Sequence, residues 1–259
     1  MKHCTKGFHL ARLDLHLAKN SKRDLLITPL EKEGIIKILS QPFSYLDRGA
    51  QCYVFESKDQ KYVIKIFQEQ RAVTPISRWK LKNRAPQKRR DFSGCLTAYN
   101  LAKEETALIY VHLNPTQNEW PTLTIRDPIG RKFSLPLDRY FFVVQKKVKP
   151  LSRALLEASA QGCLPDLFQS YFSLIKTRAS KGIWNEDRSV DSNFGFLEKE
   201  AIEIDFDHYI EAPEFLKKGY QSYEVDRFIV EMREWIEMKL PHELGLFDSE
   251  LVKFRLESE

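Results

Sequence analysis

The stretch Leu46-Asp-Arg-Gly-Ala-Gln-Cys-Tyr-Val54, followed closely by Tyr62-Val-Ile-Lys-Ile-Phe67, decides how the first half of this chain folds. Both stretches contain β-branched and aromatic residues, Gly49 interrupts the first, and Ser57-Lys-Asp-Gln60 separates the two. Runs of this composition divided by turn residues are typical of paired β-strands. The sequence therefore predicts strands over 44–47, 51–56 and 61–67, with the last two forming a β-hairpin.

The rest of the first half is expected to be strand-rich, with a helix inside it. Pro29 to Leu39 predicts a short helix, because Thr28 can cap it and proline suits its first turn. A second helix is expected over 92–105, where apolar residues recur at helical spacing. Further strands are expected over 107–113, 121–126, 131–136 and 140–145, with Asp127-Pro-Ile-Gly130 as a turn.

After Pro150 the pattern becomes mostly helical. Helices are predicted over 152–160, 166–180 and 223–239, and the last carries one apolar stripe with Ser222 as its expected N-cap. Phe194 to Leu197 and Ala201 to Ile204 predict a short hairpin. The fold class expected is therefore α+β, with a strand-rich part followed by a mostly helical part.

Composition narrows the classes of protein further. The chain has 259 residues, 42% of them hydrophobic and 30% charged, which is typical of a globular protein. No apolar run approaches the roughly 18–20 residues that a membrane span requires, and the four cysteines are scattered without a CxxC pair. We therefore expect no integral membrane segment, disulfide framework or zinc site, and a cytoplasmic protein, with export lacking a cleavable signal left open.

Charge is distributed unevenly along the chain. Residues 61–100 contain ten Lys or Arg against two acids, whereas residues 186–259 contain twenty Asp or Glu against nine Lys or Arg. The simpler interpretation is two solvated faces of opposite charge. A basic part can instead meet an anionic ligand.

Lys65 is the first candidate for binding such an anion. It lies in a strand that is apolar on both sides, so it needs either an anionic partner or an exposed position, such as an edge strand facing solvent. Gly49 precedes it in a turn, and a glycine lets the backbone approach a phosphate without a Cβ in the way. Together they predict a site for a phosphate-bearing ligand.

Asn193 and Asp205 form the second candidate site. They flank the expected hairpin, which would bring them together at its open end. An amide oxygen and a carboxylate suit Mg²⁺, a hard cation that takes its other ligands from water and phosphate. The alternative for Asp205 is an ordinary turn at the end of a strand.

These phrases, in this order, resemble the protein-kinase-like superfamily, nearer its atypical members such as aminoglycoside phosphotransferases and lipid-kinase-like enzymes. The resemblance covers about residues 45–210. It implies a two-lobed fold: an N-terminal extension over 1–43, an N-lobe over 44–148 and a C-lobe over 149–259. It also implies an ATP- and Mg²⁺-dependent phosphotransferase acting on an acceptor that the sequence does not identify.

The resemblance assigns roles residue by residue. Gly49 would lie in the phosphate loop, and Lys65 would pair with the nucleotide phosphates. Gln145 and Lys147 would lie in the strand and hinge that face adenine. Asn193 and Asp205 would bind the metal.

Several features depart from the family pattern. Asp47 and Cys52 occupy positions of the phosphate loop where kinases often have glycine, and Asp207 replaces the glycine that follows Asp-Phe. The usual His-Arg-Asp phrase is absent, and the family spacing places the base at Arg188; Asp187 requires a one-residue insertion, and Asp191 is the other acid nearby. Glu104 and Glu105 lie at the far end of the expected helix, a poor position for pairing with Lys65. A pseudokinase, which binds or scaffolds without transfer, is therefore an alternative.

A third interpretation concerns the segment 78–90, which carries seven Lys or Arg, no acid, and Trp79. Such a segment can bind nucleic acid or anionic lipid headgroups. It can equally be a solvated loop. A polyanion-binding protein is thus the second alternative.

Overall fold

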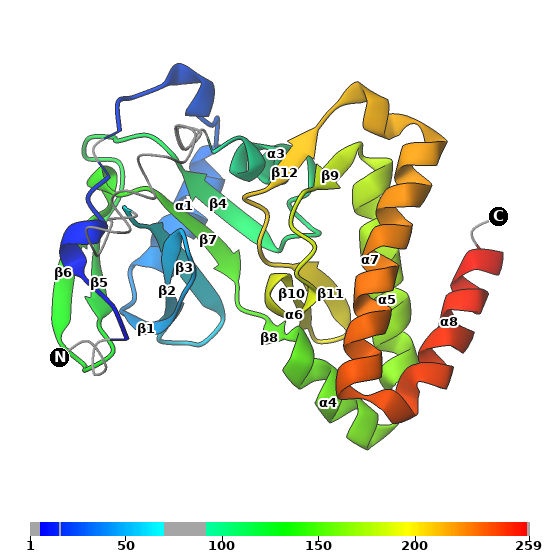
Figure 1. Cartoon of the computed structure of the whole chain (residues 1–259). Coiled ribbons are helices and arrows are strands. Elements are labelled where there is room, and N and C mark those ends of the chain that lie inside the picture. Colours follow the sequence, from blue (N-terminus) through cyan, green and yellow to red (C-terminus); the bar gives the residue numbers. More distant parts are fainter. Residues whose placement is uncertain (1–5, 16, 70–91, 258–259) are drawn as a thin grey trace, which may run out of the picture. The chain divides into compact units, whose positions relative to one another are not determined.

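The structure is a computed structural model that describes residues 6–15, 17–69 and 92–257. It divides into two compact units (Figure 1). The first comprises Met1–Phe92 and Ile109–Lys147, and the second comprises Ser93–Leu108 and Val148–Glu259. The first is rich in strands and the second is mostly helical, so the mixed α+β class expected from the sequence is confirmed.

The first unit is organised around a β-sheet. Among the described residues the sheet has seven strands in the order β4-β7-β3-β2-β1-β5-β6. They are β1 (Phe43–Arg48), β2 (Cys52–Ser57), β3 (Tyr62–Phe67), β4 (Leu108–His112), β5 (Thr122–Arg126), β6 (Lys132–Pro136) and β7 (Phe142–Lys146). The expected β2–β3 hairpin is confirmed by antiparallel pairing. The pair β1–β5 is parallel, a long-range contact that local pattern does not predict.

Helix α1 (Pro29–Leu39) forms where the sequence predicts it. The Thr28 hydroxyl accepts from the Glu31 amide and the Glu31 carboxylate accepts from the Thr28 amide, which completes a capping box. The turn at Asp127 is also confirmed, since its carboxylate accepts from the amides of Ile129 and Arg131. Short 3-10 helices lie at Leu10–Arg12, Ser21–Arg23 and Leu137–Arg139.

The residues before α1, for which the sequence suggests no structure, pack onto the sheet unit. Phe8 is 3% exposed and its ring lies 5.0 Å from that of Tyr53. The Tyr53 hydroxyl donates to the Gly7 carbonyl at 2.8 Å, and the Glu69 amide donates to the Arg12 carbonyl. The segment thus covers part of the sheet close to the β1–β2 turn.

The second unit is built on long helices and three small strand pairs. Its helices are α3 (Ser93–Leu101), α4 (Leu151–Gln161), α5 (Leu164–Ser180), α6 (Val190–Asn193), α7 (Lys218–Lys239) and α8 (Leu244–Leu256), with 3-10 turns at Pro213–Leu216 and Pro241–Glu243. Its strands are β8 (Lys149–Pro150), β9 (Ile183–Asn185), β10 (Phe194–Leu197), β11 (Glu200–Glu203) and β12 (Tyr209–Glu211). Strand β10 pairs with β8 and β11, and β9 pairs with β12.

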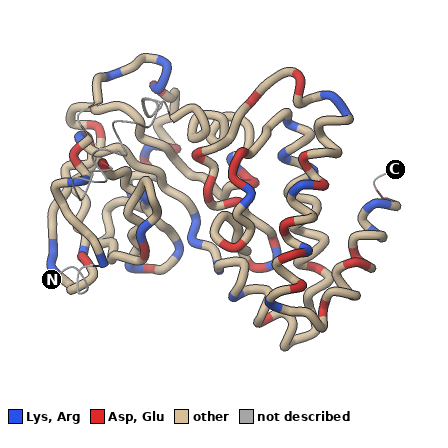
Figure 2. Tube along the Cα trace, viewed as in Figure 1, with Lys and Arg blue, Asp and Glu red and all other residues tan. Residues whose placement is uncertain are grey.

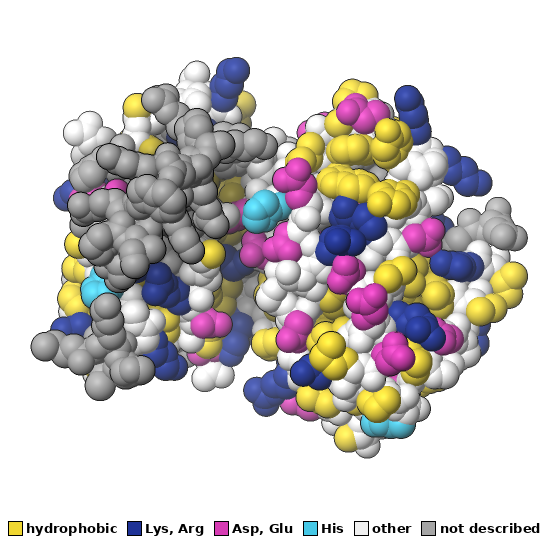
Figure 3. Space-filling model, in the orientation of Figure 1, with side chains coloured by type: hydrophobic (Ala, Val, Ile, Leu, Met, Phe, Trp, Pro, Cys, Tyr) yellow, Lys and Arg dark blue, Asp and Glu magenta, His cyan; other side chains and the backbone are white. Residues whose placement is uncertain are grey.

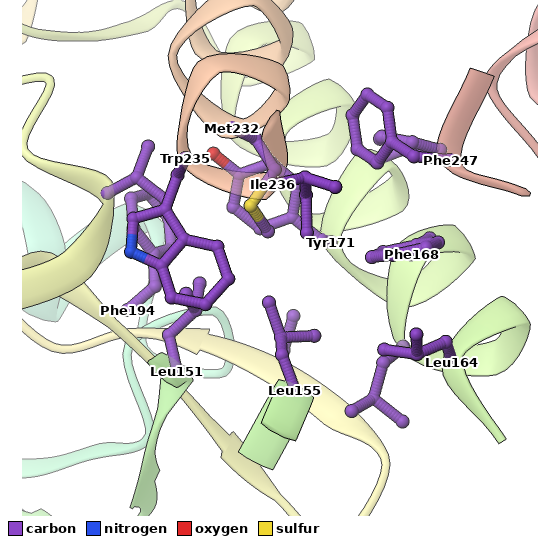
Figure 4. Close-up of a cluster of buried hydrophobic side chains, with 14 of the residues drawn as sticks. Leu151, Leu155, Leu164, Phe168, Tyr171, Phe194, Met232, Trp235, Ile236 and Phe247 are labelled. Atoms are coloured by element: carbon purple, nitrogen blue, oxygen red, sulfur yellow. The ribbon is translucent and has the colours of Figure 1, made fainter. Parts of the chain in front are cut away.

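Helix α5 is central to this unit and contacts both α7 and α8 (Figure 1). Its apolar face meets aromatic side chains from the other helices, including the Phe168–Phe247 pair at 5.1 Å. Figure 4 shows Trp235 and Ile236 of α7 closing over this core beside Tyr171. Figure 2 shows acidic and basic residues interspersed along α7.

Two expected helices differ in extent or capping, and one helix was not expected. The helix predicted over 92–105 ends at Leu101 and belongs to the second unit, because α3 packs on the segment around β12. Helix α7 begins at Lys218, so Ser222 is not its cap; the Ser222 hydroxyl donates to the Lys218 carbonyl inside the helix. Helix α8 is additional. None of the helices in the described residues is both long and apolar enough to cross a bilayer.

Candidate functional site

Strand register places the candidate residues of the first unit on one face of the sheet. In antiparallel pairs, directly opposed residues share a face. Lys65 lies opposite Val54 on one side and Val143 on the other, and Val63 lies opposite Gln145. These five residues therefore line the same face. The opposite face is fully buried, with Phe55, Ile64, Ile66, Phe142 and Val144 all at 0% exposure.

Lys65 occupies an interior position of the sheet, because β3 lies between β2 and β7. The edge-strand explanation for this lysine is therefore wrong. Its side chain is half-buried, whereas Ile64 and Ile66 on either side are wholly buried. The sheet thus presents this cation beside Val54, Val63, Val143 and the buried side chain of Gln145.

Gly49 lies in the turn between β1 and β2. Its amide donates to the Cys52 carbonyl at 3.0 Å, and its carbonyl accepts from the Gln68 side chain at 3.2 Å. A Cβ at Gly49 would come no closer than 3.7 Å to the Cys52 Sγ, which is ordinary contact. Neither the backbone nor the neighbours within the chain require glycine here.

Gln145 and Lys147 come from the end of β7. Gln145 is 1% exposed and shares the face of Lys65. The Lys147 amide donates to the Lys61 carbonyl at 2.8 Å, and its ammonium group pairs with the carboxylate of Glu56. Because both polar groups of Lys147 have partners within the sheet, its predicted role facing a nucleotide has no direct support here.

The hairpin of the second unit returns the chain to Asn193 just before Asp205. Phe194 pairs with Glu203, and the Ile204 amide donates to the Asn193 carbonyl at 2.7 Å. Asp205 therefore follows directly after Ile204, the residue that lies opposite Asn193. Asn193 is 2% exposed, whereas Asp205 is exposed.

Asp187 and Asp191, the two candidate catalytic acids, have different surroundings. Asp187 lies close to Asn193. Burial raises the pKa of the Asp187 carboxyl, but hydrogen bonds from Ser189, together with the nearby Asn193 amide and the charge of His208, outweigh burial and hold the pKa below its ordinary value. Its carboxylate accepts from the Ser189 amide at 3.0 Å. Asp191 is exposed in the first turn of α6. Of the two acids, Asp187 is the one that the Asn193 side chain influences.

A fully buried ion cluster lies beneath these residues. Arg178 of α5 donates to Glu203 at 2.5 and 2.6 Å and to Glu224 of α7 at 2.6 Å, and the side chains of Arg178 and Glu203 have no exposed surface. Tyr209 donates to Glu203 at 2.6 Å. Burial raises the pKa of Glu224 more than the Arg178 charge lowers it. The sequence offered one signal: Arg178 continues the apolar stripe of α5, where a charge requires partners.

The segment after α3 supplies another ion pair. The Glu105 carboxylate binds the Lys181 ammonium at 2.5 Å, and the Glu105 carbonyl accepts from the Glu203 amide. Glu105 therefore has a partner inside the second unit. Glu104 is exposed.

Helix α3 approaches the Asp205 segment closely. A Cβ on Gly94 would lie 2.5 Å from the carbonyl oxygens of Phe206 and Asp207, so only glycine fits. The neighbouring Cys95 thiol donates to the Asp207 carboxylate at 3.3 Å. Helix α3 thus supports the chain immediately after Asp205.

An aromatic stack lies at the surface of the second unit. The Trp184 ring is stacked with Phe215 at 5.4 Å and with Tyr223 at 5.8 Å, and the Arg227 guanidinium carbon lies 3.8 Å from its centroid. Figure 3 shows hydrophobic side chains gathered on this unit, with basic side chains beside them. The stack anchors β9 just before Asp187.

Metal binding would rely on few protein ligands. Within residues 6–15, 17–69 and 92–257, no group of three or more His, Cys, Asp or Glu side chains is placed to hold a metal ion. The donor pair Asn193 and Asp205 still fits Mg²⁺, since this ion usually takes only one or two carboxylates from the protein and retains water. The basic segment 78–90 lies outside the described residues.

Among solved structures, the chain is similar to WbdD and to the ROP18 kinase domain. No protein-family model matches the chain. No curated protein matches it. A 2.2 Å crystal structure of WbdD is 15% identical, with a TM-score of 0.39, over 82% of this chain and 46% of that one. WbdD with the kinase inhibitor LY294002 is 13% identical, with a TM-score of 0.42, over 80% and 45%.

The ROP18 kinase domain in complex with AMP-PNP and sucrose is 12% identical, with a TM-score of 0.35, over 69% of this chain and 60% of that one. The chain spans less than half the length of the WbdD chains that it matches. At TM-scores below 0.5 these similarities carry no functional argument.

Proposed function

We propose that this chain is a kinase-like phosphotransferase that binds ATP with Mg²⁺ and transfers the γ-phosphate to a hydroxyl-bearing acceptor. The observation that supports the proposal is the hairpin, which returns the chain to Asn193 one residue before Asp205, with Asp187 near the Asn193 side chain. An amide, a metal-binding carboxylate and an ionised carboxylate near one another are the groups that phosphoryl transfer needs.

The first unit carries side chains that suit a nucleotide. The face that carries Lys65 also carries Val54, Val63 and Val143. Apolar side chains suit a planar base, and the ammonium group suits phosphate oxygens. This arrangement supports nucleotide binding by the sheet.

Each residue then has one role. Lys65 would neutralise phosphate charge, and Asn193 and Asp205 would hold Mg²⁺, which supplies charge neutralisation for the phosphates when bound. Asp187 would accept a hydrogen bond from the acceptor hydroxyl. Because its pKa is below the ordinary value, Asp187 is a weak base, and its role is chiefly to orient the hydroxyl.

The test is a thermal shift with ATP, with Mg²⁺ and again with chelator, because a ligand that binds only the folded state raises the melting temperature. We expect a Mg²⁺-dependent rise in the wild type, its loss in Asp205→Ala and its reduction in Lys65→Ala. Glu200→Ala is the matched control, since Glu200 is an exposed acid on the same hairpin. The absence of any rise in the wild type would overturn the proposal.

One observation favours a pseudokinase as the second candidate. Helix α3 contains no acidic residue, and Glu105 is paired with Lys181. Active kinases have an ion pair between the strand lysine and a helix glutamate, and neither α3 nor Glu105 supplies that glutamate for Lys65. A thermal shift that is independent of Mg²⁺, together with no ATP turnover, would select this candidate.

A further inference from the structure

The side chain of Asn185, at the end of β9, links the buried ion cluster to Asp187. Asn185 has no exposed surface. Its Nδ2 donates to the Glu203 carboxylate at 2.7 Å, and its Oδ1 accepts from the Asp187 amide at 2.9 Å. One amide thus spans a buried carboxylate and the backbone of a candidate site residue.

The orientation of this amide is set by its partners. An ionised carboxylate only accepts hydrogen bonds, and a backbone amide only donates them. A flipped Asn185 amide would place its oxygen against Glu203 and its nitrogen against the Asp187 amide, losing both bonds. The Asn185 side chain is therefore locked in one orientation.

Glu203 is itself fixed, which makes it a rigid support. Arg178 and Tyr209 donate to its two oxygens, and both donors are buried. Glu203 is also the last residue of β11, two residues before Asp205. The Glu203–Asn185 bond therefore joins the segment that carries Asp187 to the segment that carries Asp205.

The main chain of Asn185 is held independently of its side chain. Its amide donates to Glu224 at 3.0 Å, and its carbonyl accepts from the Arg227 guanidinium. Strand pairing of β9 with β12 adds to this support. Truncating the side chain therefore removes its two hydrogen bonds while the strand keeps its other contacts.

We propose that Asn185 is a positioning residue for Asp187: it transmits the fixed geometry of the buried Arg178–Glu203 pair to the Asp187 backbone and so aims the Asp187 carboxylate. This inference rests on the proposed function for its effect on phosphate transfer. The other part of the inference, that Asn185 holds the Asp187 loop in place, does not depend on the proposed function. A misplacement on the order of 1 Å can cost roughly 100-fold in rate.

The experiment compares Asn185→Ala with Asn114→Ala. Asn114 is also a buried asparagine whose amide makes several hydrogen bonds, but it holds Asn20 and Asp24 in the first unit. We expect Asn185→Ala to lower kcat about 10- to 100-fold with the KM for ATP within about twofold of wild type. Asn114→Ala should lower the melting temperature comparably and leave kcat near wild type.

One further measurement separates positioning from a general structural role. Amide hydrogen exchange, followed by NMR, should accelerate at Asp187 and Ser189 in Asn185→Ala and stay unchanged in Asn114→Ala.

The possible failures are distinguishable. If exchange at Asp187 and Ser189 is unchanged in Asn185→Ala, the positioning inference is wrong. Equal losses of kcat in Asn185→Ala and Asn114→Ala would also overturn it, because they indicate general destabilisation. If the wild type transfers no phosphate, the proposed function fails, and the exchange measurement alone decides whether Asn185 positions the loop.

Discussion

The carbonyl oxygen of Asn193 accepts a hydrogen bond from the amide of Ile204 at 2.7 Å, one step beyond the last ladder pair of the β10–β11 hairpin. This bond extends the hairpin just far enough to bring Asp205 next to Asn193. Asn193 is also the last residue of α6 and is followed directly by β10, so its backbone is fixed from both directions. Backbone pairing therefore sets where the chain that carries Asp205 passes Asn193.

The first prediction separates the two candidate catalytic acids. Asp187→Ala should lower the rate of phosphate transfer by at least 100-fold, since Asp187 lies beside Asn193 and is held ionised. Asp191→Ala should stay within about threefold of wild type, because Asp191 is exposed in the first turn of α6. Steady-state kinetics of both variants checks this. A larger loss in Asp191→Ala would reverse the assignment.

Much of the fold could be predicted because its elements carry local signals. Thr28 and Pro29 mark the start of α1, and turn residues separate β2 from β3. The parallel β1–β5 pairing could not be predicted, since it joins strands far apart in the sequence through backbone groups. Helix α8 was missed because its buried face is narrow and includes Glu250 among Phe247 and Phe254.

The candidate site was predictable in part for the same reason. Asn193 and Asp205 flank a local hairpin, so their proximity follows from pairing between near neighbours in the chain. The Arg178 cluster brings together α5, β9, β11 and α7, and no short-range pattern specifies which acids meet a buried arginine. The ion pair between Glu105 and Lys181 also joins residues far apart in the sequence, so local pattern does not predict it.

The second prediction concerns the close approach of α3 to the Asp205 segment. Gly94→Ala should destabilise the protein by about 1–3 kcal/mol, because the added Cβ would lie 2.5 Å from two backbone oxygens that cannot easily move. Gly34→Ala is the matched control: Gly34 lies inside α1 with nothing within 4 Å of its Cβ position. That variant should be more stable by roughly 0.5–1 kcal/mol. Urea unfolding of both measures the difference, and equal effects would contradict the packing argument.

The third prediction is a loss of stability in acid that traces to His112. Burial lowers the pKa of His112 from 6.5 to about 4, so the unfolded chain binds this proton more readily than the folded one. Stability from the neutral ring is complete above the unfolded pKa of 6.5, and it declines as the pH falls from 6.5 towards 4. The full effect is on the order of 3 kcal/mol.

His112→Phe should remove most of this acid dependence. The His112 ring is stacked on Phe142 at 4.9 Å, and its Nε2 has no hydrogen-bond partner among the described residues, so phenylalanine keeps the stacking but loses the hydrogen bond between the ring and the Asp138 backbone. Urea midpoints at about pH 7.5 and pH 5 should converge in this variant. The control is His242→Gln, since His242 is exposed. Unchanged acid sensitivity in His112→Phe would show that another group is responsible.

The fourth prediction tests the buried ion cluster. Arg178→Met leaves the Glu203 and Glu224 carboxylates buried without their shared cation, which should destabilise the protein by about 3–5 kcal/mol. Adding Glu203→Gln should recover part of the loss, because one of the two stranded charges is then removed. Lys199→Met breaks an exposed ion pair with Asp166 and should leave the urea midpoint unchanged. If Arg178→Met were as stable as wild type, the Arg178 charge would not be needed to neutralise Glu203 and Glu224. Glu203 could then not be regarded as the rigid support that holds Asn185.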